Sequence, residues 1–313
     1  MSFASEMKKN LCRIKSESLE CQKAELSAIV RTNGQIHILG GNKTNLSIKS
    51  ENAAIARLIF TLVKKCFNVN VEIQTKKNFR KNKKNIYLIS INNSTEILGD
   101  LHILTNAKGF YQITNTINSN LVESFDAKKA YLRGIFLGGG SVNNPKKEYH
   151  LELNVHNEIF GESIINLLNE FGLKSKMISR KGNFVIYMKE SDHIVTFLNV
   201  IGAHKSLFEF ENARTLKQVR NNVNRIVNCE TANLTKTVNA AYRHVEAIEN
   251  IMNKKGLDYL DTELQELALL RLANQECSLV ELVKLYNGDI SKSSMNYKLK
   301  KIEKISEKIN KGE

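Results

Sequence analysis

The chain carries the same structural unit twice, and this internal repeat constrains its fold more than any other feature. The segment 24–104 aligns with the segment 130–203 at an offset of about 105 residues, which changes only at loops. "AELSAIVRTNG" at the start of the first segment corresponds to "AYLRGIFLGGG" at the start of the second, and Leu46 later corresponds to Leu151. A steady offset of this kind indicates two copies of one folding unit.

Each copy is predicted to run helix, strand, strand, helix, strand, strand, helix. In one predicted strand Leu151, Leu153 and Val155 alternate with polar residues, so one face of the sheet is expected to be buried and the other exposed to solvent. The middle helix of the second copy carries apolar residues at helical spacing, among them Ile164 and Leu168. The sequence therefore predicts an α+β fold in which a continuous antiparallel sheet has helices on one face and a polar face open to a partner.

The net charge of the chain favours a polyanionic partner. Lys and Arg number 46 against 32 Asp and Glu, which leaves a formal charge of +14 and makes nucleic acid the leading candidate. No run of 18 apolar residues or signal peptide is present, so we expect a cytoplasmic protein that does not enter a membrane. The five cysteines lack metal-binding spacing and are expected to be reduced and mostly buried, with no metal or other cofactor.

Residues 261–310 have the spacing of a helix-turn-helix. A first helix covers "TELQELALLRLAN", and a second begins at Ser278 with Glu281 three residues later, which forms a capping box. "NGD" with Gly288 then makes a short turn, and Ser291 caps a third helix.

The third helix presents a polar face suited to DNA. Met295, Leu299 and Ile302 form its buried stripe. Asn296 ranks first for base contact, because an amide can bond adenine bidentately, and lysines behind it can meet phosphates. The alternative is a solvated face on a protein-binding module. The predicted DNA contacts of this module are Ser278, Ser291, Lys292, Ser293, Asn296, Tyr297, Lys300 and Lys301.

A second basic region occupies the strand tips of the repeat. "KKNFRKNKK", residues 76–84, lies at the predicted hairpin tip between strands near Val71 and Tyr87. Electrostatics predicts nonspecific affinity for a nucleic-acid backbone there, while a merely solubilising loop stays open as an alternative. The predicted contacts are Lys76, Lys77, Arg80, Lys81, Lys83 and Lys84 in the first copy, and Lys174, Lys176 and Arg180 in the second.

The connector between the repeat and the last module is basic and helical. Arg214, Lys217 and Arg220 recur at three-residue steps and so share a flank of one helix, and Arg225 follows. This flank is either a solvated face or a phosphate contact, for which Arg220 and Arg225 are the candidates. "NCETANLTKT", residues 228–237, is predicted to break the helix and position the last module.

The two helices that end in "LSAIVRTNG" and "LRGIFLGGG" resemble the paired motif helices of the LAGLIDADG homing endonucleases. The resemblance implies that they pack at a pseudo-twofold axis, where Ala28, Gly134 and Gly138 allow close approach. It also implies that the sheets and their tips straddle duplex DNA. The family's catalytic acids fall on Asn33 and Gly139, which cannot hold a divalent cation, so the resemblance implies a fold without its nuclease chemistry.

Nearly the whole chain resembles the WhiA family of bacterial transcription regulators. The matching segments are "YLRGIFLGGGSVNNP", "RNNVNRIVNCETANLTKTVNAA" and "LALLRLANQECSLVELVKLYNGDISKSSMNYKLKKI". The chain departs from the family at 287–289, where prolines are usual, and at Tyr297, where His is usual.

This resemblance implies a nucleoid-associated regulator without catalytic activity, tied to sporulation or to cell division and chromosome segregation. Its implied partners are double-stranded promoter DNA and RNA polymerase or a sigma factor, and a monomer is favoured. The expected parts are two LAGLIDADG-like repeats, a helical connector and a helix-turn-helix domain, at 1–120, 121–208, 209–253 and 254–313.

Two other functions compete with this interpretation. One is a metal-dependent endonuclease or RNA maturase, whose cleavage would depend on acids near the motif helices such as Glu25 or Glu148. The other is a nucleoid or RNA-polymerase adaptor that acts mainly through protein contacts of the connector and the outer helix faces.

Overall fold

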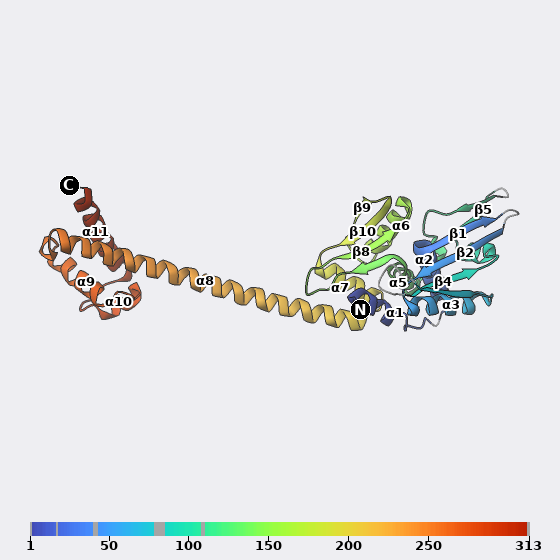
Figure 1. Cartoon of the computed structure of the whole chain (residues 1–313), viewed down its shortest axis with the longest axis horizontal. Helices are drawn as coiled ribbons and strands as arrows, with labels where there is room; N and C mark the ends of the chain where they lie inside the picture. Colours follow the sequence, from blue (N-terminus) through green and yellow to red (C-terminus); the bar gives the residue numbers. More distant parts are fainter. Residues whose placement is uncertain (1, 17, 40–42, 78–84, 108–109, 312–313) are drawn as a thin grey trace. The chain divides into compact units, whose positions relative to one another are not determined.

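The computed structural model describes residues 2–16, 18–39, 43–77, 85–107 and 110–311 (Figure 1). The chain divides into two compact units, Met1–Lys217 and Gln218–Glu313. Across the described ranges, no helix is both long and apolar enough to cross a membrane.

Unit 1 contains both copies of the repeat, and each has the predicted order of elements. Elements outside the repeat are the helix α1 (Phe3–Leu11), the hairpin of β5 (Leu104–Ala107) and β6 (Phe110–Ile113), and a 3-10 turn at Ser119–Val122. The first copy consists of α2 (Leu19–Asn33), β1 (Gly34–Leu39), β2 (Lys43–Ser50), α3 (Ala53–Phe67), β3 (Glu72–Lys77), β4 (Asn85–Ile91) and α4 (Thr95–Asp100). The second consists of α5 (Phe125–Gly139), β7 (Gly140–Val142), β8 (Leu151–Val155), α6 (Glu158–Asn169), β9 (Lys176–Arg180), β10 (Asn183–Met188) and α7 (Ser191–Val200).

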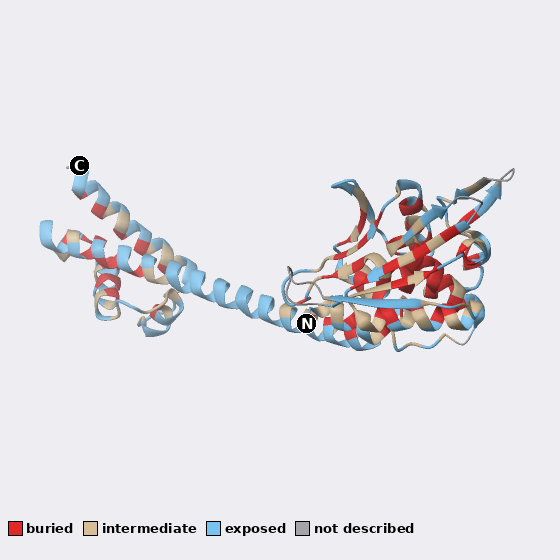
Figure 2. Ribbon diagram, turned by 45° about the vertical axis from the view of Figure 1, so that its right-hand side comes forward, coloured by how far each residue is buried: buried red, intermediate tan, exposed pale blue. Residues whose placement is uncertain are grey.

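The strands form two separate four-stranded antiparallel sheets, in the orders β1-β2-β4-β3 and β7-β8-β10-β9. The prediction of one continuous sheet is therefore wrong in this respect. The motif helices α2 and α5 pack against each other between the two copies, which separates the sheets at the junction (Figure 1). The predicted alternation is confirmed, since Leu153 opposes Ile186 and Ile48 opposes Ile89, and all four side chains are buried. Figure 2 shows buried residues, in red, on both the strands and the helices of unit 1.

The seam between α2 and α5 depends on residues without bulk. A Cβ added to Gly134 would overlap the carbonyl oxygen of Glu25 and lie 2.7 Å from the Cβ of Ala28. A Cβ added to Gly138 would overlap the hydroxyl of Thr32. The predicted roles of Ala28, Gly134 and Gly138 are confirmed, because any larger side chain would push the two backbones apart.

The connector is one uninterrupted helix, α8 (His204–Lys254), so the predicted break at 228–237 is wrong. The segment contains no Gly or Pro. Its Thr hydroxyls bond within the helix instead, and Thr235 and Thr237 each donate to the carbonyl four residues earlier, at 2.9 Å. Every side chain in 218–236 is exposed.

Unit 2 is built from the end of α8 and the helices α9 (Thr262–Ala273), α10 (Leu279–Leu285) and α11 (Lys292–Lys311). A 3-10 turn, Leu257–Tyr259, joins α8 to α9. Ile248 and Ile251 of α8 contribute to a core with Leu267, Leu282 and Leu299.

The five cysteines are all free. Cys21 is buried and Cys12, Cys66 and Cys277 are partly buried, but Cys229 on α8 is exposed. The expectation of mostly buried thiols is therefore wrong for Cys229, which lies in the exposed stretch 218–236 of α8.

Candidate nucleic-acid interface

The positions of the family's catalytic acids lie at the C-terminal ends of α2 and α5, and neither holds a carboxylate. Asn33 Nδ2 donates to the carbonyl of Lys49 at 2.6 Å, and the carbonyl of Gly139 accepts from Asn154 Nδ2 at 3.1 Å. A Cβ added to Gly139 would overlap the carbonyl oxygen of Asn154. Each position is thus hydrogen-bonded to a strand of its own copy, Asn33 to β2 and Gly139 to β8. Among residues that the structure describes, no group of three or more His, Cys, Asp and Glu could hold a metal ion.

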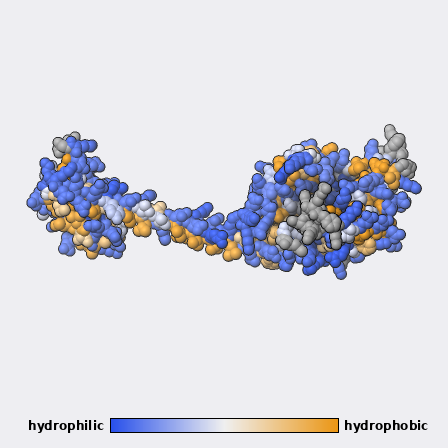
Figure 3. Space-filling model, in the orientation of Figure 1, coloured by the Kyte–Doolittle hydropathy of each residue, from blue (hydrophilic) through white to orange (hydrophobic). Residues whose placement is uncertain are grey.

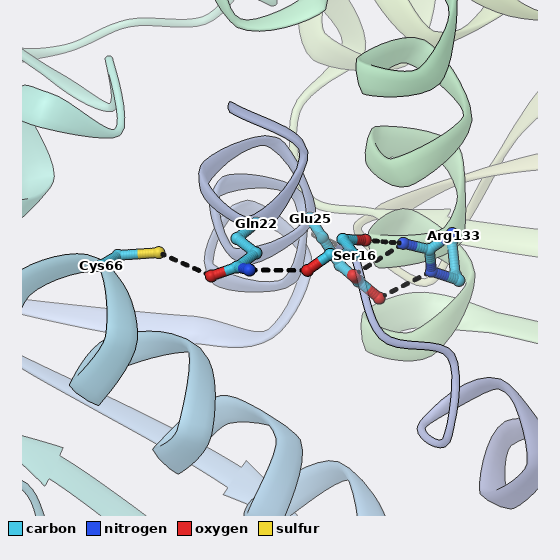
Figure 4. Close-up of polar contacts among 5 residues, drawn as sticks. All are labelled: Ser16, Gln22, Glu25, Cys66 and Arg133. Atoms are coloured by element: carbon cyan, nitrogen blue, oxygen red, sulfur yellow. Dashed lines mark hydrogen bonds and ion pairs between the residues drawn. The ribbon is translucent and has the colours of Figure 1, made fainter. Parts of the chain in front are cut away.

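Glu25, an acid named by the nuclease hypothesis, is held in a buried ion pair across the seam (Figure 4). Arg133 donates through Nε to Glu25 Oε1 at 2.9 Å and through Nη2 to Oε2 at 2.8 Å. The same Nη2 donates to Ser16 Oγ at 2.8 Å. Burial opposes the charge of Arg133, but the hydrogen bonds and attraction of Glu25 raise its pKa above the ordinary value. Both oxygens of Glu25 are therefore used in holding the fold together.

Glu148, the other acid of that hypothesis, lies on the surface before β8. Its Oε1 accepts from Asn143 Nδ2 at 2.6 Å. One exposed carboxylate hydrogen-bonded to an amide does not form the paired site that a divalent cation needs.

Three described basic residues lie on the solvent faces of the two sheets, namely Lys76, Lys176 and Arg180. Lys76 in β3 opposes Ile86, on the same face as Lys49, and its side chain is exposed. Lys176 and Arg180 are exposed at alternate positions of β9, and Lys174 is exposed just before it.

Two structural features affect how Arg180 could contact a nucleic-acid backbone. Arg180 Nη1 lies 3.8 Å from Glu152 Oε1, a carboxylate that also contacts His150 at 2.8 Å, so part of its charge is balanced within the sheet. The second tip is a tight turn in which Lys181 and Gly182 both have positive φ, which presents Arg180 at the strand end.

The tip of the first copy is covered only in part. Arg80, Lys81, Lys83 and Lys84 lie outside the described residues, as does the side chain of Lys77. Their predicted role stays a prediction.

The basic flank of the connector divides into two groups. Arg214 bonds Asp192 at 2.5 Å and Lys217 Nζ donates to the carbonyl of Lys147 at 3.2 Å, so these two residues fasten α8 to unit 1. Arg220 and Arg225 are exposed. Only the latter two are placed to meet a partner.

The helix-turn-helix has the predicted caps. Ser278 Oγ accepts from the amide of Glu281 at 3.3 Å, and Glu281 Oε2 accepts from the amide of Ser278 at 2.7 Å. These bonds lower the pKa of Glu281. Ser291 Oγ accepts from the amide of Ser294 at 3.2 Å and so begins α11. Ser278 and Ser291 thus serve the fold through their hydroxyls, whatever they contribute to binding.

The polar face of α11 is open over its first two turns. Met295, Leu299 and Ile302 are buried beneath it, as predicted. Lys292, Ser293, Tyr297 and Lys300 are exposed, and Asn296 is partly buried. Tyr297 has 72% of its surface exposed.

Two features of unit 2 escape prediction. Lys301 is exposed but bonds Asp261 Oδ2 at 3.0 Å, so its charge is partly used inside the module. Arg271 is buried and donates through Nη1 to the carbonyl of Cys277 at 2.7 Å, which fixes the turn between α9 and α10. No role for Arg271 is predicted from the sequence, because only tertiary contacts show which carbonyls need a donor.

Family models of WhiA proteins match three consecutive parts of the chain. The WhiA N-terminal LAGLIDADG-like domain matches residues 19–104, the WhiA LAGLIDADG-like domain matches 128–220, and the WhiA C-terminal HTH domain matches 223–306. Together they span both units.

Curated proteins and solved structures agree with these matches. A "probable cell division protein WhiA" from Alkaliphilus metalliredigens is 43% identical and covers 98% of both chains. A protein of the same name from Thermoanaerobacter sp. strain X514 is 46% identical over 99% of this chain and 98% of its own. The crystal structure of full-length DUF199/WhiA from Thermotoga maritima has a TM-score of 0.61 at 29% identity, and the match covers 98% of this chain and 99% of that one.

Proposed function

The chain belongs to the WhiA family, and from this premise we propose that it is a non-catalytic, DNA-binding transcription regulator that acts in cell division. We extend the proposal to chromosome segregation and sporulation, to a nucleoid location in the cytoplasm, and to RNA polymerase or a sigma factor as a protein partner. The proposed nucleic-acid partner is double-stranded promoter DNA, bound by a monomer.

The observation that carries the proposal is the open polar face of α11. A buried stripe of Met295, Leu299 and Ile302 fixes the rotation of the helix, which leaves Ser293 exposed and Asn296 partly exposed near its N-terminus. Residues at this end of a recognition helix contact base edges, while lysines contact phosphates. Asn296 is the proposed base reader, and Lys292 and Lys300 are the proposed phosphate contacts.

The LAGLIDADG-like unit supplies the second proposed contact. Lys76, Lys176 and Arg180 are exposed on the solvent faces of the two sheets, and Lys174 lies beside them. Two weak contacts joined in one chain bind more tightly than either alone, because the first raises the effective concentration of the second. This gives a physical reason for one chain to retain both modules.

The exposed stretch of α8, residues 218–236, adds positive charge in the part of the sequence that joins the two modules. Arg220 and Arg225 stand on it with three amides, Asn221, Asn224 and Asn228. Arg and Asn side chains together suit a phosphate backbone and its base edges. We include this stretch in the proposed DNA contact.

Loss of catalysis is part of the proposal, and three structural observations support it. Asn33 bonds Lys49, Gly139 has no room for a side chain, and Glu25 is paired with Arg133. A hard divalent cation prefers carboxylate oxygens, and these positions supply none that is free.

A protein-adaptor function is the second candidate, favoured by the apolar residues on the same exposed stretch of α8. Val219, Val223, Ile226, Val227 and Leu234 are each more than half exposed, and Figure 3 shows hydrophobic surface along the helix. Exposed apolar surface of this kind marks protein contacts. Genome-wide occupancy separates the candidates, since an adaptor would show no sequence motif of its own.

A duplex shift assay tests the regulator. Asn296→Ala should weaken specific binding by about 1–3 kcal/mol, and Lys292→Ala should weaken binding to all sequences and reduce the salt slope by about one. Lys308→Ala, at the far end of α11, is the matched control and should leave binding unchanged. Equal binding by all three variants at moderate salt would count against the helix-turn-helix as the DNA contact.

A further inference from the structure

The helix α1 lies outside the repeat and brings a lysine to the seam of the motif helices. Met7 and Leu11 are fully buried and anchor the helix to unit 1. On its other side, Lys8 Nζ donates to the carbonyl of Leu137 at 3.2 Å and lies 5.6 Å from the ring centre of Phe136. Leu137 comes two residues before Gly139, so this ammonium group stands at the end of α5 that lacks the catalytic acid.

Lys8 lines a basic cleft at the same end of the seam. The cleft measures about 910 Å³, within the ~300–1,000 Å³ of small-molecule sites. Its walls include Lys8, Lys9, Lys49, Arg57, Asn33 and Ser141. The helix α3 begins in the wall, and its N-terminal dipole adds to the positive potential.

The positive charge of this cleft is largely uncompensated within the part of the chain that the structure describes. Glu51 is the one acidic residue of the described lining, and it has a partner of its own. The carbonyl of Leu137 satisfies only one donor of Lys8, and burial lowers the pKa of this amine to about 8. Lys49 and Arg57 are exposed at the cleft, and Arg57 donates through Nε to the carbonyl of Ala53 at 3.3 Å.

We propose that this cleft binds a phosphate group, with Lys8 supplying at the seam the positive charge that a divalent ion supplies in an active nuclease of this fold. Lys49 and Arg57 complete the site as charged donors from β2 and α3. A bound phosphate would add a second acceptor for the Lys8 ammonium and favour its charged form. An amine can bind a phosphate but cannot activate water as a metal ion does, so the site holds its ligand without cutting it.

The phosphate has two possible sources, the backbone of duplex DNA and a free nucleotide. The first source rests on the proposed function and would make the seam a DNA contact in its own right. The second is independent of it and would make the cleft a site for a small effector. The experiment has one arm for each.

Both arms use the full chain with Lys8→Met, which keeps most of the apolar stem, and with Arg57→Gln at an exposed position. Lys64→Met is the matched control, because Lys64 is partly buried on α3 but does not line the cleft. Calorimetry with ATP and with pyrophosphate is the arm that tests a free nucleotide. Duplex binding in a Lys292→Ala, Asn296→Ala background, which removes the helix-turn-helix contact, is the arm that tests the DNA backbone.

We expect Lys8→Met and Arg57→Gln to weaken binding at least tenfold in one arm or both, and Lys64→Met to have no effect. A loss for ATP assigns a nucleotide, and a loss for duplex alone assigns the DNA backbone. If both cleft variants match Lys64→Met in both arms, the proposal is overturned. That failure differs from failure of the proposed function, in which Lys292→Ala and Asn296→Ala themselves leave duplex binding unchanged.

Discussion

The guanidinium of Arg133 on α5 holds both carboxylate oxygens of Glu25 on α2, at 2.9 and 2.8 Å, across the seam between the two copies. The side chains are only 7% and 2% exposed. The pair joins the two motif helices through two hydrogen bonds and an ion pair. It also ties down Ser16, in the segment that leads from α1 to α2.

Removal of one partner from this pair should destabilise unit 1 strongly. Arg133→Met leaves the Glu25 carboxylate buried and unpaired, which costs about 3–5 kcal/mol. The double variant Arg133→Met, Glu25→Leu should recover most of this loss, because no buried charge remains. Calorimetric unfolding of the full chain measures both, and a double variant no more stable than the single one would contradict this explanation.

Gly139 should be intolerant of any side chain. Its added Cβ would overlap the carbonyl oxygen of Asn154, so Gly139→Ala should cost about 1–3 kcal/mol through displaced backbone. Gly99→Ala is the control, since nothing lies within 4 Å of that Cβ. Thermal unfolding of unit 1 compares them. Equal melting temperatures would show that the seam has more room than the structure gives it.

Unit 2 should lose stability as the pH falls from 7 to 4. His244 is 3% exposed, and burial with the charges of Arg271 and Arg243 lowers its pKa from 6.5 to about 4. Below pH 6.5 the unfolded chain protonates His244 while the folded chain stays largely unprotonated there. This difference lowers the free energy of unfolding by about 3 kcal/mol at pH 4. Amide exchange in α11 follows this loss. His244→Gln should flatten the pH dependence, and an unchanged slope in that variant would assign it to other groups.

The middle of α8 should be the least stable helical segment in the described parts of the chain. Every side chain in 218–236 is exposed, and Asn, Val and Thr are poor helix formers. Its amides should exchange at least about tenfold faster than those of Ile248 and Ile251, which are buried. Duplex DNA should slow the exchange around Arg220 and Arg225. Rates equal to those at Ile248 would indicate a partner that covers the helix.

The sequence predicts the elements of both units because periodicity and capping are local signals. Alternation in β8 of unit 1, and the capping box at Ser278 and the stripe under α11 in unit 2, are read directly from spacing, and the structure confirms all three. The continuous sheet and the break in α8 were wrong. Neither the junction between copies nor the continuity of a poor helix former is encoded by spacing alone.

Some residues of the candidate site could be predicted from the sequence, and others could not. Exposure of Lys76, Lys176, Lys292 and Tyr297 follows from the pattern and is observed. The roles of Arg214 and Lys217 in fastening α8 depend on tertiary contacts that no periodicity shows. Lys8 gives no signal at all in the sequence, because α1 precedes the repeat and reaches the seam only in the folded chain.

A footprint in the presence of Mg²⁺ tests most directly whether the chain binds DNA without nuclease chemistry. The purified chain is incubated with end-labelled genomic duplex and Mg²⁺, and both protection and strand breaks are followed over time. We expect defined protected sites whose phosphodiester bonds stay intact. Nicks within those sites that require Mg²⁺ would contradict this expectation, and so would the absence of any protected site.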